Sequence, residues 1–344
     1  MLLLLFMVVA AGCGSDSETA ETGDDSTETS DTDDSTTSEP DDDSTETSET
    51  DDDSTMTAGE GGEITFAVNP WNGSAVNVAV ASQLLESELG YTVDSVEIDE
   101  NAQWAAINTG DVDASLEVWP SGHAQNVADF IDSDDGNVVN AGALGPVGSI
   151  GWFIPTYMVD EHPELATWEG FADPALAGLF ATAETGDLGQ FLGGDPSFVQ
   201  YDEDIIANLE LPLQVVYAGS EEAILAQLDA AYSREEPVLI YLWTPHAAFN
   251  AYDLTQVALP DYSDECYATA EDGGVDCDYP ADELFKIMSA DVEGPAAAFL
   301  NAMSYTTADQ IEMLASVETD GLSVEEAAAA WIAAHEDTWS AWLQ

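Results

Sequence analysis

The chain of 344 residues carries 70 acidic side chains against 2 basic ones, a formal net charge of -68 at pH 7. Binding to a nucleic-acid backbone depends on lysine and arginine, so this composition excludes nucleic acid as a partner. The same charge disfavours a free anionic ligand and favours a cation or a zwitterion. It also predicts a solvated acidic surface in a salty environment, where salt screens the repulsion between carboxylates.

Residues 1–13 form an apolar run that ends in Ala10-Ala11-Gly12-Cys13. The run is shorter than the roughly 20 residues of a membrane-spanning helix and is typical of a signal peptide. Its end resembles a bacterial lipobox, which implies that Cys13 becomes an acylated lipid anchor on the membrane. An ordinary cleaved secretory signal is the alternative, because no lysine or arginine precedes the run.

Residues 14–60 are a low-complexity stretch of Ser, Thr, Asp and Glu. Such a stretch buries too little apolar surface to offset its ordering entropy, so we expect a disordered acidic tether. Repulsion between its charges would extend it and hold the folded part away from the anchoring membrane. The folded part is expected to begin near Gly61.

Alternating strands and helices are predicted after this point. The apolar periodicity predicts a strand over 64–68, a helix over 74–89 ended by Gly90, a strand over 92–98, a helix over 102–109 ended by Gly110, and a strand over 112–118. Units of this kind predict a parallel sheet covered by helices.

The chain is then predicted to cross into a second region and to return. The apolar segment 145–158 predicts the first crossing, a helix over 221–232 precedes a strand over 238–242, and 254–259 predicts the return. We therefore expect two lobes, lobe 1 formed by residues 61–150 with 256–344 and lobe 2 formed by residues 151–255.

The C-terminal third is predicted to be helical. Ser323 and Glu326 fit a capping box ahead of a helix over 327–343, and Thr307 with Gln310 fits a weaker one.

Two loops pair a tryptophan with a proline at the end of a predicted strand. The first carries Trp119 and His123, and the second carries Trp243 and His246. Open α/β sheets bind ligands beyond the carboxyl ends of their strands, so these loops predict two walls of one pocket. Tryptophan faces attract a quaternary ammonium group by cation–π interaction, and histidine can hydrogen-bond a carboxylate. The pattern indicates a betaine-type ligand, with core packing as the alternative for both tryptophans.

From residue 64 to residue 343 the chain resembles the glycine betaine and proline betaine substrate-binding proteins of ABC importers. The matching stretches are Leu-Gly-Tyr-Thr-Val at 89–93, Gly-Asp-Val-Asp-Ala at 110–114, Val-Trp-Pro at 118–120, Gly-Trp-Phe-Ile-Pro at 151–155 and Leu-Trp-Thr-Pro-His at 242–246. The resemblance implies a two-lobed α/β fold of the type II periplasmic-binding-protein class, with two crossover segments and the ligand in the interlobe cleft. It implies an extracytoplasmic monomer without catalytic activity or cofactor, which delivers its ligand to an ABC permease in the membrane.

In that family three aromatic residues surround the trimethylammonium group. Trp119 and Trp243 match two of them, and the third position falls on Phe198. Phenylalanine has the weaker cation–π face, so Tyr201 is the alternative third wall.

The resemblance also implies a carboxylate contact from a histidine after one of the two loops, which here is His123 or His246. Backbone N–H groups near Gly73 and Ser74, at the start of a predicted helix, would complete the carboxylate site. Choline and carnitine remain alternative ligands of the same transporter class.

Other tryptophans and acids are assigned to structure rather than to the ligand. Trp71 and Trp152 are expected in the core, and Glu117 is expected to be a solvated strand residue.

The remaining two cysteines, Cys266 and Cys277, lie in a polar, glycine-containing segment. Outside the cytosol such a pair most simply forms a disulfide that pins a surface loop. A metal site is the alternative, but no histidine lies near and the spacing matches no zinc pattern.

Other functional classes find less support. A hydrolase would need an activated nucleophile, yet no Gly-x-Ser-x-Gly elbow occurs, so no enzyme is predicted. The run 132–136 resembles a calcium loop but lacks its spacing and terminal Glu, so no metal is predicted. A ligand-sensing module remains as an alternative function.

Overall fold

The computed structural model of the chain describes residues 61–344, so the predictions for the signal peptide, Cys13 and the tether lie outside the described residues. Within this range the strands are β1 Gly62–Val68, β2 Tyr91–Glu97, β3 Ala114–Val118, β4 Val138–Pro155, β5 Gly189–Gly193, β6 Leu213–Tyr217, β7 Ile240–Thr244, β8 Leu254–Gln256 and β9 Ala281–Ser289.

The helices fall into an early, a middle and a late group along the chain. The α-helices are α1 Asn72–Leu89, α2 Ala102–Thr109, α3 Ala124–Phe130, α4 Thr156–Glu161, α5 Trp168–Phe171, α6 Pro174–Ala177, α7 Asp202–Asn208, α8 Glu221–Tyr232, α9 Ala248–Ala251, α10 Asp264–Tyr267, α11 Gly294–Ala302, α12 Thr307–Glu318, α13 Val324–Ala334 and α14 Glu336–Trp339. The 3₁₀ turns are η1 Pro120–Gly122, η2 Pro163–Ala166, η3 Gly178–Phe180, η4 Ala270–Asp272 and η5 Ser340–Leu343.

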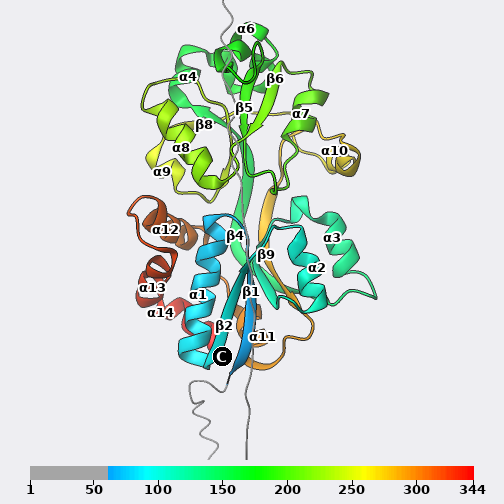
Figure 1. Cartoon of the computed structure of the whole chain (residues 1–344), viewed down its shortest axis with the longest axis vertical. Helices are drawn as coiled ribbons and strands as arrows, with labels where there is room; N and C mark the ends of the chain where they lie inside the picture. Colours follow the sequence, from blue (N-terminus) through cyan, green and yellow to red (C-terminus); the bar gives the residue numbers. More distant parts are fainter. Residues whose placement is uncertain (1–60) are drawn as a thin grey trace, which may run out of the picture. The chain divides into compact units, whose positions relative to one another are not determined.

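The strands form two groups that β4 and β9 connect. The sheet order is β2-β1-β3-β9-β4-β7-β5-β6, with β8 on β4. Figure 1 shows β1 to β3 with α1 to α3 and α11 to α14 in one lobe, and β5, β6 and β8 with α4 and α6 to α10 in the other. Strand β7 pairs with β5. The long strand β4 and strand β9 run between the two lobes (Figure 1).

The predicted parallel sheet is mixed in the structure. Strand β1 is parallel to β2 and β3, and β5 is parallel to β6 and β7. Strand β9, however, is antiparallel to both β3 and β4, and β4 is antiparallel to β7. The reason is that the chain leaves lobe 1 along β4 and returns beside it along β9, so the two connecting strands run in opposite directions. The return lies in β9, and the predicted segment 254–259 contributes only β8 on the edge of β4.

Several element boundaries agree with the sequence predictions because glycines end the helices. Gly90 and Gly110 follow α1 and α2 in the left-handed conformation, with φ of 68° and 79°, which a side chain would oppose. The capping box of Ser323 and Glu326 opens α13 as predicted.

The second predicted capping box is wrong by one position, since Thr306 and Asp309 form it. The predicted long C-terminal helix is also wrong, because α13 ends at Ala334 and two short turns, α14 and η5, follow it.

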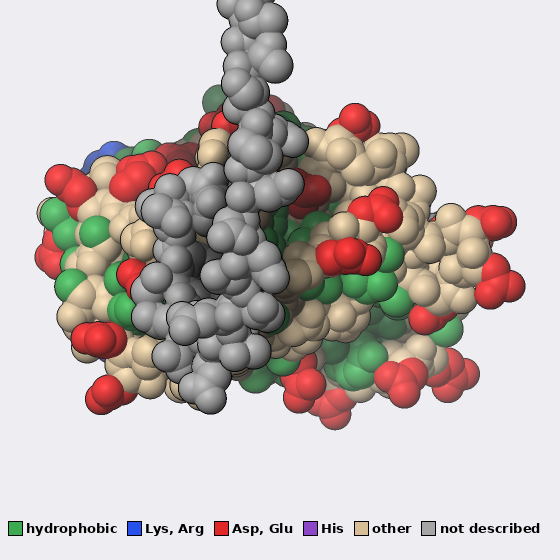
Figure 2. All heavy atoms as spheres, turned by 90° about the horizontal axis from the view of Figure 1, so that it is seen from below, with side chains coloured by type: hydrophobic (Ala, Val, Ile, Leu, Met, Phe, Trp, Pro, Cys, Tyr) green, Lys and Arg blue, Asp and Glu red, His purple; other side chains and the backbone are tan. Residues whose placement is uncertain are grey.

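Acidic side chains are scattered over the visible face of the molecule in Figure 2. The two basic side chains neutralise few of these acidic groups. Arg234 is exposed and pairs with Glu236 at 2.7 Å, whereas the Nζ of Lys286 is buried and donates to the carbonyls of Ala143 and Met303, each at 2.6 Å. Burial lowers the pKa of Lys286 to about 8. Within residues 61–344 no helix is long and apolar enough to cross a membrane.

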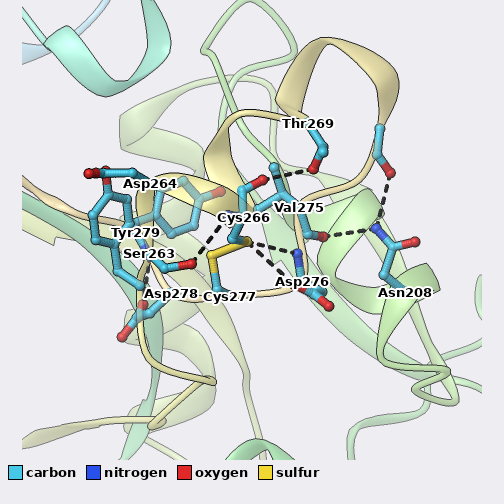
Figure 3. Close-up of a disulfide and its surroundings, with 12 residues drawn as sticks. Asn208, Ser263, Asp264, Cys266, Thr269, Val275, Asp276, Cys277, Asp278 and Tyr279 are labelled. Carbon is cyan, nitrogen blue, oxygen red and sulfur yellow. Dashed lines mark hydrogen bonds between the residues drawn. A yellow bond between two sulfur atoms is a disulfide. The ribbon is translucent and has the colours of Figure 1, made fainter.

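A disulfide joins Cys266 to Cys277, as predicted (Figure 3). The loop that it closes lies against α7, where Asn208 donates its side-chain amide to the carbonyl of Val275 at 2.9 Å. Tyr279 follows the second cysteine by two positions and is buried. The disulfide therefore fixes the approach of the chain to Tyr279 and to β9.

Replacing both Cys266 and Cys277 by serine should lower the free energy of unfolding by roughly 3 kcal/mol, since the disulfide closes a loop of 11 residues in the unfolded chain. Chemical denaturation of the variant and the parent measures this difference. An unchanged denaturation midpoint would show that the loop does not depend on the cross-link.

Candidate functional site

A cavity opens between the two lobes, with about 460 Å³ of empty space, part of it open to solvent. Its lining is mostly aromatic and consists of Trp71, Glu100, Trp119, Ser121, Gly122, Ile150, Phe198, Val199, Tyr201, Tyr241, Trp243 and Tyr279.

The sheet topology explains why these residues meet. In lobe 1, Trp71 follows β1, Glu100 follows β2 and Trp119 follows β3, and the carboxyl ends of these parallel strands share one edge of the sheet. In lobe 2, Trp243 lies on β7, and Phe198 lies in the loop after β5, a parallel neighbour of β7. Both lobes thus present strand ends and aromatic side chains to the same space.

Phe198 stands nearly perpendicular to two of the tryptophans that line the cavity. The ring centroid of Phe198 lies 5.5 Å from that of Trp71 at an interplanar angle of 84°. It lies 5.9 Å from that of Trp243 at 89°. Perpendicular neighbours present faces and edges in different directions, which suits a small, nearly spherical cation better than a flat ligand.

The predicted aromatic residues Trp119, Phe198, Trp243 and Tyr201 all line this cavity. The sequence interpretation missed Trp71, which was assigned to the core. Its signal was present, since Trp71 also adjoins a proline at the end of a strand, as the two recognised tryptophans do. Trp152 is a core residue as predicted, with no exposed surface.

The carboxylate of Glu117 hydrogen-bonds two of the tryptophans that line the cavity. Its Oε1 accepts hydrogen bonds from the indole nitrogens of Trp71 at 2.8 Å and Trp119 at 3.1 Å. Its Oε2 accepts from the side-chain amides of Asn77 at 2.6 Å and Gln310 at 2.8 Å. The prediction of a solvated strand residue is wrong, because Glu117 is only 2 % exposed. Burial raises the pKa of Glu117, and the four N–H donors oppose this shift.

Gly73 and Ser74 lie behind the wall, beside Glu117, rather than in the lining. A Cβ on Gly73 would stand 2.9 Å from both carboxylate oxygens of Glu117, so the absence of a side chain leaves room for that carboxylate. The hydroxyl of Ser74 accepts a hydrogen bond from the backbone N–H of Asn69 at 3.0 Å. Their predicted contact with a ligand carboxylate stays a prediction, and this geometry does not favour it.

His123 is buried and faces Glu100 instead of the cavity. Its Nε2 lies 2.9 Å from Glu100 Oε2, and its Nδ1 lies 3.0 Å from the side-chain amide of Asn126. The other oxygen of Glu100 accepts from the backbone N–H of Val199, in the opposite lobe. The imidazole is therefore engaged by a protein carboxylate at the place where a ligand carboxylate was predicted.

His246 is likewise buried behind the cage, with its ring centroid 5.0 Å from that of Trp243. Its Nε2 lies 3.2 Å from Glu221 Oε1, and its Nδ1 lies 3.3 Å from Glu318 Oε2. Burial alone would lower the pKa of His246, but the two glutamates outweigh burial and raise it. Burial raises the pKa of Glu318 to about 7. The ligand contacts expected from both histidines stay predictions.

Asp202 stabilises another wall. Its Oδ1 accepts from the indole of Trp152 at 2.6 Å and from the hydroxyl of Tyr279 at 3.1 Å. Burial raises the pKa of Asp202 to about 7. The Tyr279 hydroxyl also accepts from the backbone N–H of Tyr201 at 2.8 Å, which ties two lining tyrosines together.

The charge that the lining residues contribute to the cavity is negative. Glu100 is the one charged side chain among the lining residues, and Ser121 donates its hydroxyl to Asp282 at 2.7 Å. Both basic side chains of the described chain have partners outside the lining, Lys286 two backbone carbonyls and Arg234 Glu236. The cavity can therefore attract a cation through aromatic faces and a carboxylate, but offers no cationic side chain to a ligand anion.

Comparison with known proteins agrees with this chemistry. The model of the family described as the substrate-binding domain of ABC-type glycine betaine transport systems (OpuAC) matches residues 62–334. The chain belongs to this family. Family membership confirms the predicted class, a substrate-binding protein of an ABC transport system.

Among curated proteins the chain is similar to the trimethylamine N-oxide-binding protein of Pelagibacter ubique (strain HTCC1062). The two are 29 % identical over 290 residues, which cover 80 % of this chain and 89 % of the relative.

Among solved structures, lactococcal OpuAC in its closed form with glycine betaine aligns with a TM-score of 0.65 at 19 % identity, covering 82 % of this chain and 99 % of that one. An ABC-transporter choline-binding protein in complex with choline aligns with a TM-score of 0.66 at 18 % identity, covering 82 % and 91 %. These similarities confirm the predicted two-lobed periplasmic-binding-protein fold.

Substituting Glu117 by glutamine should weaken both folding and ligand binding. The glutamine amide would face the donors Asn77 and Gln310, so buried hydrogen bonds would be lost at a cost of about 1–3 kcal/mol, and the two tryptophans would lose their common charged acceptor. Thermal denaturation and ligand titration measure the two effects. Glu97→Gln, on the exposed face of the edge strand β2, is the matched control and should change neither. Parent-like behaviour of Glu117→Gln would mean that the indoles are held by packing alone.

Proposed function

We propose that this protein captures a small trimethylammonium compound of the glycine betaine type outside the cytoplasmic membrane and delivers it to an ABC permease for uptake in osmoprotection. The observation that carries the proposal is the cavity between the lobes, walled by Trp71, Trp119, Phe198 and Trp243. A trimethylammonium group has no hydrogen-bond donor, so aromatic faces are its natural contacts.

Closure of the two lobes around the ligand would give these contacts their strength. Cation–π attraction reaches about 2 kcal/mol or more for a desolvated pair, compared with about 0.5–1 kcal/mol at an exposed site. The walls come from both lobes, so only the closed arrangement surrounds the cation. The ligand-binding residues that we propose are Trp71, Trp119, Phe198, Tyr201 and Trp243.

Choline is the second candidate ligand. The carboxylate of Glu100 is part of the lining, and a carboxylate accepts a hydrogen bond from a hydroxyl but repels a ligand carboxylate. Glycine betaine would need the N–H groups of the backbone or a displaced histidine for its carboxylate, whereas choline would not. Carnitine, which carries both a hydroxyl and a carboxylate, lies between these two cases.

The wider cellular setting is part of the same proposal. We propose that Cys13 anchors a monomer to the outer face of the membrane through the tether of residues 14–60, and that the protein catalyses no reaction.

The expected lobe division, residues 61–150 with 256–344 and residues 151–255, stays a proposal. The hydrogen bonds of Asn208 to the carbonyls of Gly273 and Val275 favour extending lobe 2 toward residue 280.

Calorimetric titration of the purified protein in high salt tests the proposal with four ligands: glycine betaine, choline, tetramethylammonium and 3,3-dimethylbutan-1-ol. The last is the neutral isostere of choline, with carbon in place of nitrogen. We expect binding of glycine betaine, choline and tetramethylammonium and little or no binding of the isostere, because the cage recognises charge. Equal binding of choline and its isostere would contradict the cation–π mechanism, and no binding of any ligand would refute the proposed function.

The variant Trp243→Ala should weaken binding roughly 30-fold or more, the equivalent of about 2 kcal/mol. Trp168→Ala is the matched control, since Trp168 begins α5 in the same lobe and is not among the lining residues. Similar losses in both variants would indicate general destabilisation of lobe 2 rather than a ligand contact.

A further inference from the structure

We propose that Glu318 and His246 form a proton-dependent latch between the two lobes, which together with Glu221 favours the closed cavity only when this cluster holds one extra proton. The proposal rests on the proposed function in assuming that the closed lobes are the ligand-binding form. It goes beyond that function in assigning a role to a buried cluster outside the cavity lining.

The cluster joins elements of both lobes. Glu318 is the last residue of α12, in the lobe that contains α1. Glu221 is the first residue of α8, in the other lobe (Figure 1). His246 follows β7, which pairs with β5 of that lobe. Across the interface, Glu221 also accepts hydrogen bonds from the backbone N–H of Asn72 at 2.7 Å and from its side chain at 3.2 Å.

The three side chains of the cluster are buried, and among the described residues the imidazole is their only basic partner. The side chains of His246, Glu221 and Glu318 are 1 %, 2 % and 8 % exposed. The groups that face one another here are these three and the neutral Asn72, which come from α1, α8, α12 and the loop after β7. Two buried carboxylates beside a neutral imidazole would leave two uncompensated negative charges.

The arrangement of the charged groups around His246 favours an additional proton. The Nδ1 atom of His246 lies 3.0 Å from the backbone nitrogen of Ala248, whose N–H donates to it. In a neutral ring the hydrogen then resides on Nε2, on the side of Glu221. Glu318 Oε2 lies 3.3 Å from Nδ1, so an ionised Glu318 would set a negative oxygen against a nitrogen lone pair.

One added proton removes this conflict in either of two positions. A protonated Glu318 would donate to the neighbouring carboxylate of Glu221, because the single lone pair of Nδ1 already accepts from Ala248. A doubly protonated imidazole would give up the bond to Ala248 and donate from Nδ1 to Glu318 and from Nε2 to Glu221. Both arrangements hold the same number of protons and connect α12 to the other lobe, at α8 or at the loop after β7. Burial raises the pKa of Glu318 to about 7, so the proton is retained below neutral pH and lost above it.

The latch lies directly behind the aromatic cage. His246 packs against Trp243, with ring centroids 5.0 Å apart, and Asn72 follows Trp71 in sequence. Opening the cluster would therefore separate two walls that come from different lobes. The closed form binds the extra proton and the open form does not, so ligand affinity should rise as the pH falls.

Two measurements on the full protein test the latch, one of them without ligand. Small-angle scattering of the ligand-free protein should give a smaller radius of gyration at about pH 5.5 than at about pH 8.5. Titration with choline and with glycine betaine should show a Kd that rises by up to about tenfold per pH unit as the pH approaches neutral from below and that levels off above neutral, with uptake of up to about one proton per ligand bound in the rising range. The proton uptake is read from titrations in buffers of different ionisation enthalpy.

The variant Glu318→Gln makes the test specific. Its amide can donate to Glu221 at every pH and so mimics the protonated acid, which should keep the protein compact at about pH 8.5 and abolish proton uptake. Glu318→Ala removes the link and should weaken binding at both pH values. Glu222→Gln, an exposed neighbour on α8, is the control and should behave as the parent.

The outcomes separate the latch from the proposed function. The first outcome is that no ligand binds, while the radius of gyration depends on pH in the parent and not in Glu318→Gln. This outcome would refute the proposed function and keep the latch. Ligand binding with no pH dependence in radius or Kd, or pH dependence that survives in Glu318→Gln, would overturn the latch. A loss of affinity on adding a chelator, without proton uptake, would also overturn it and assign the cluster to a metal ion instead.

Discussion

The cavity depends on one buried carboxylate. Glu117 sits at the end of β3 and binds the indole nitrogens of Trp71 and Trp119, which come from loops 48 positions apart in the sequence. A charge without solvent is tolerated only when donors surround it, and four N–H groups do so here. In turn, this arrangement uses up the polar edge of each tryptophan, so that only apolar faces remain for a ligand. The negative charge behind the rings also adds to their attraction for a cation.

The net charge of the whole chain also favours a cationic ligand. A chain with a net charge of -68 builds up a negative potential, and the cavity adds Glu100 to its own lining. The two basic residues do not oppose this field at the site, since Lys286 is bound by carbonyls and Arg234 by Glu236. The same absence of cations forces buried histidines to serve as the partners of buried glutamates, which is the origin of both histidine–glutamate clusters.

The sequence predicted the walls of the cavity better than its polar groups. Trp119 and Trp243 could be found because a tryptophan beside a proline at a strand end is a local pattern, and the sheet then brings such ends together. The surroundings of the histidines could not be predicted, because their partners lie far away in sequence: Glu100 is 23 positions from His123, and Glu318 is 72 positions from His246. Glu117 was missed for a related reason, since in a chain with 70 acids nothing local distinguishes a buried carboxylate from solvated ones.

For the fold, helices ended by glycine were predicted well, and β9 was missed. Its residues carry Asp282, Glu283 and Lys286 among apolar ones, so that its burial is decided by the strands on either side and not by its own pattern. That strand determines the mixed character of the sheet and the path between the lobes.

The most direct test of the central claim is a crystal structure of the protein with bound tetramethylammonium, which has no polar end to guide it. The account predicts that the quaternary nitrogen lies within about 6 Å of the ring centroids of Trp71, Trp119, Phe198 and Trp243. A nitrogen bound away from these rings, at surface carboxylates or in another cavity, would contradict it.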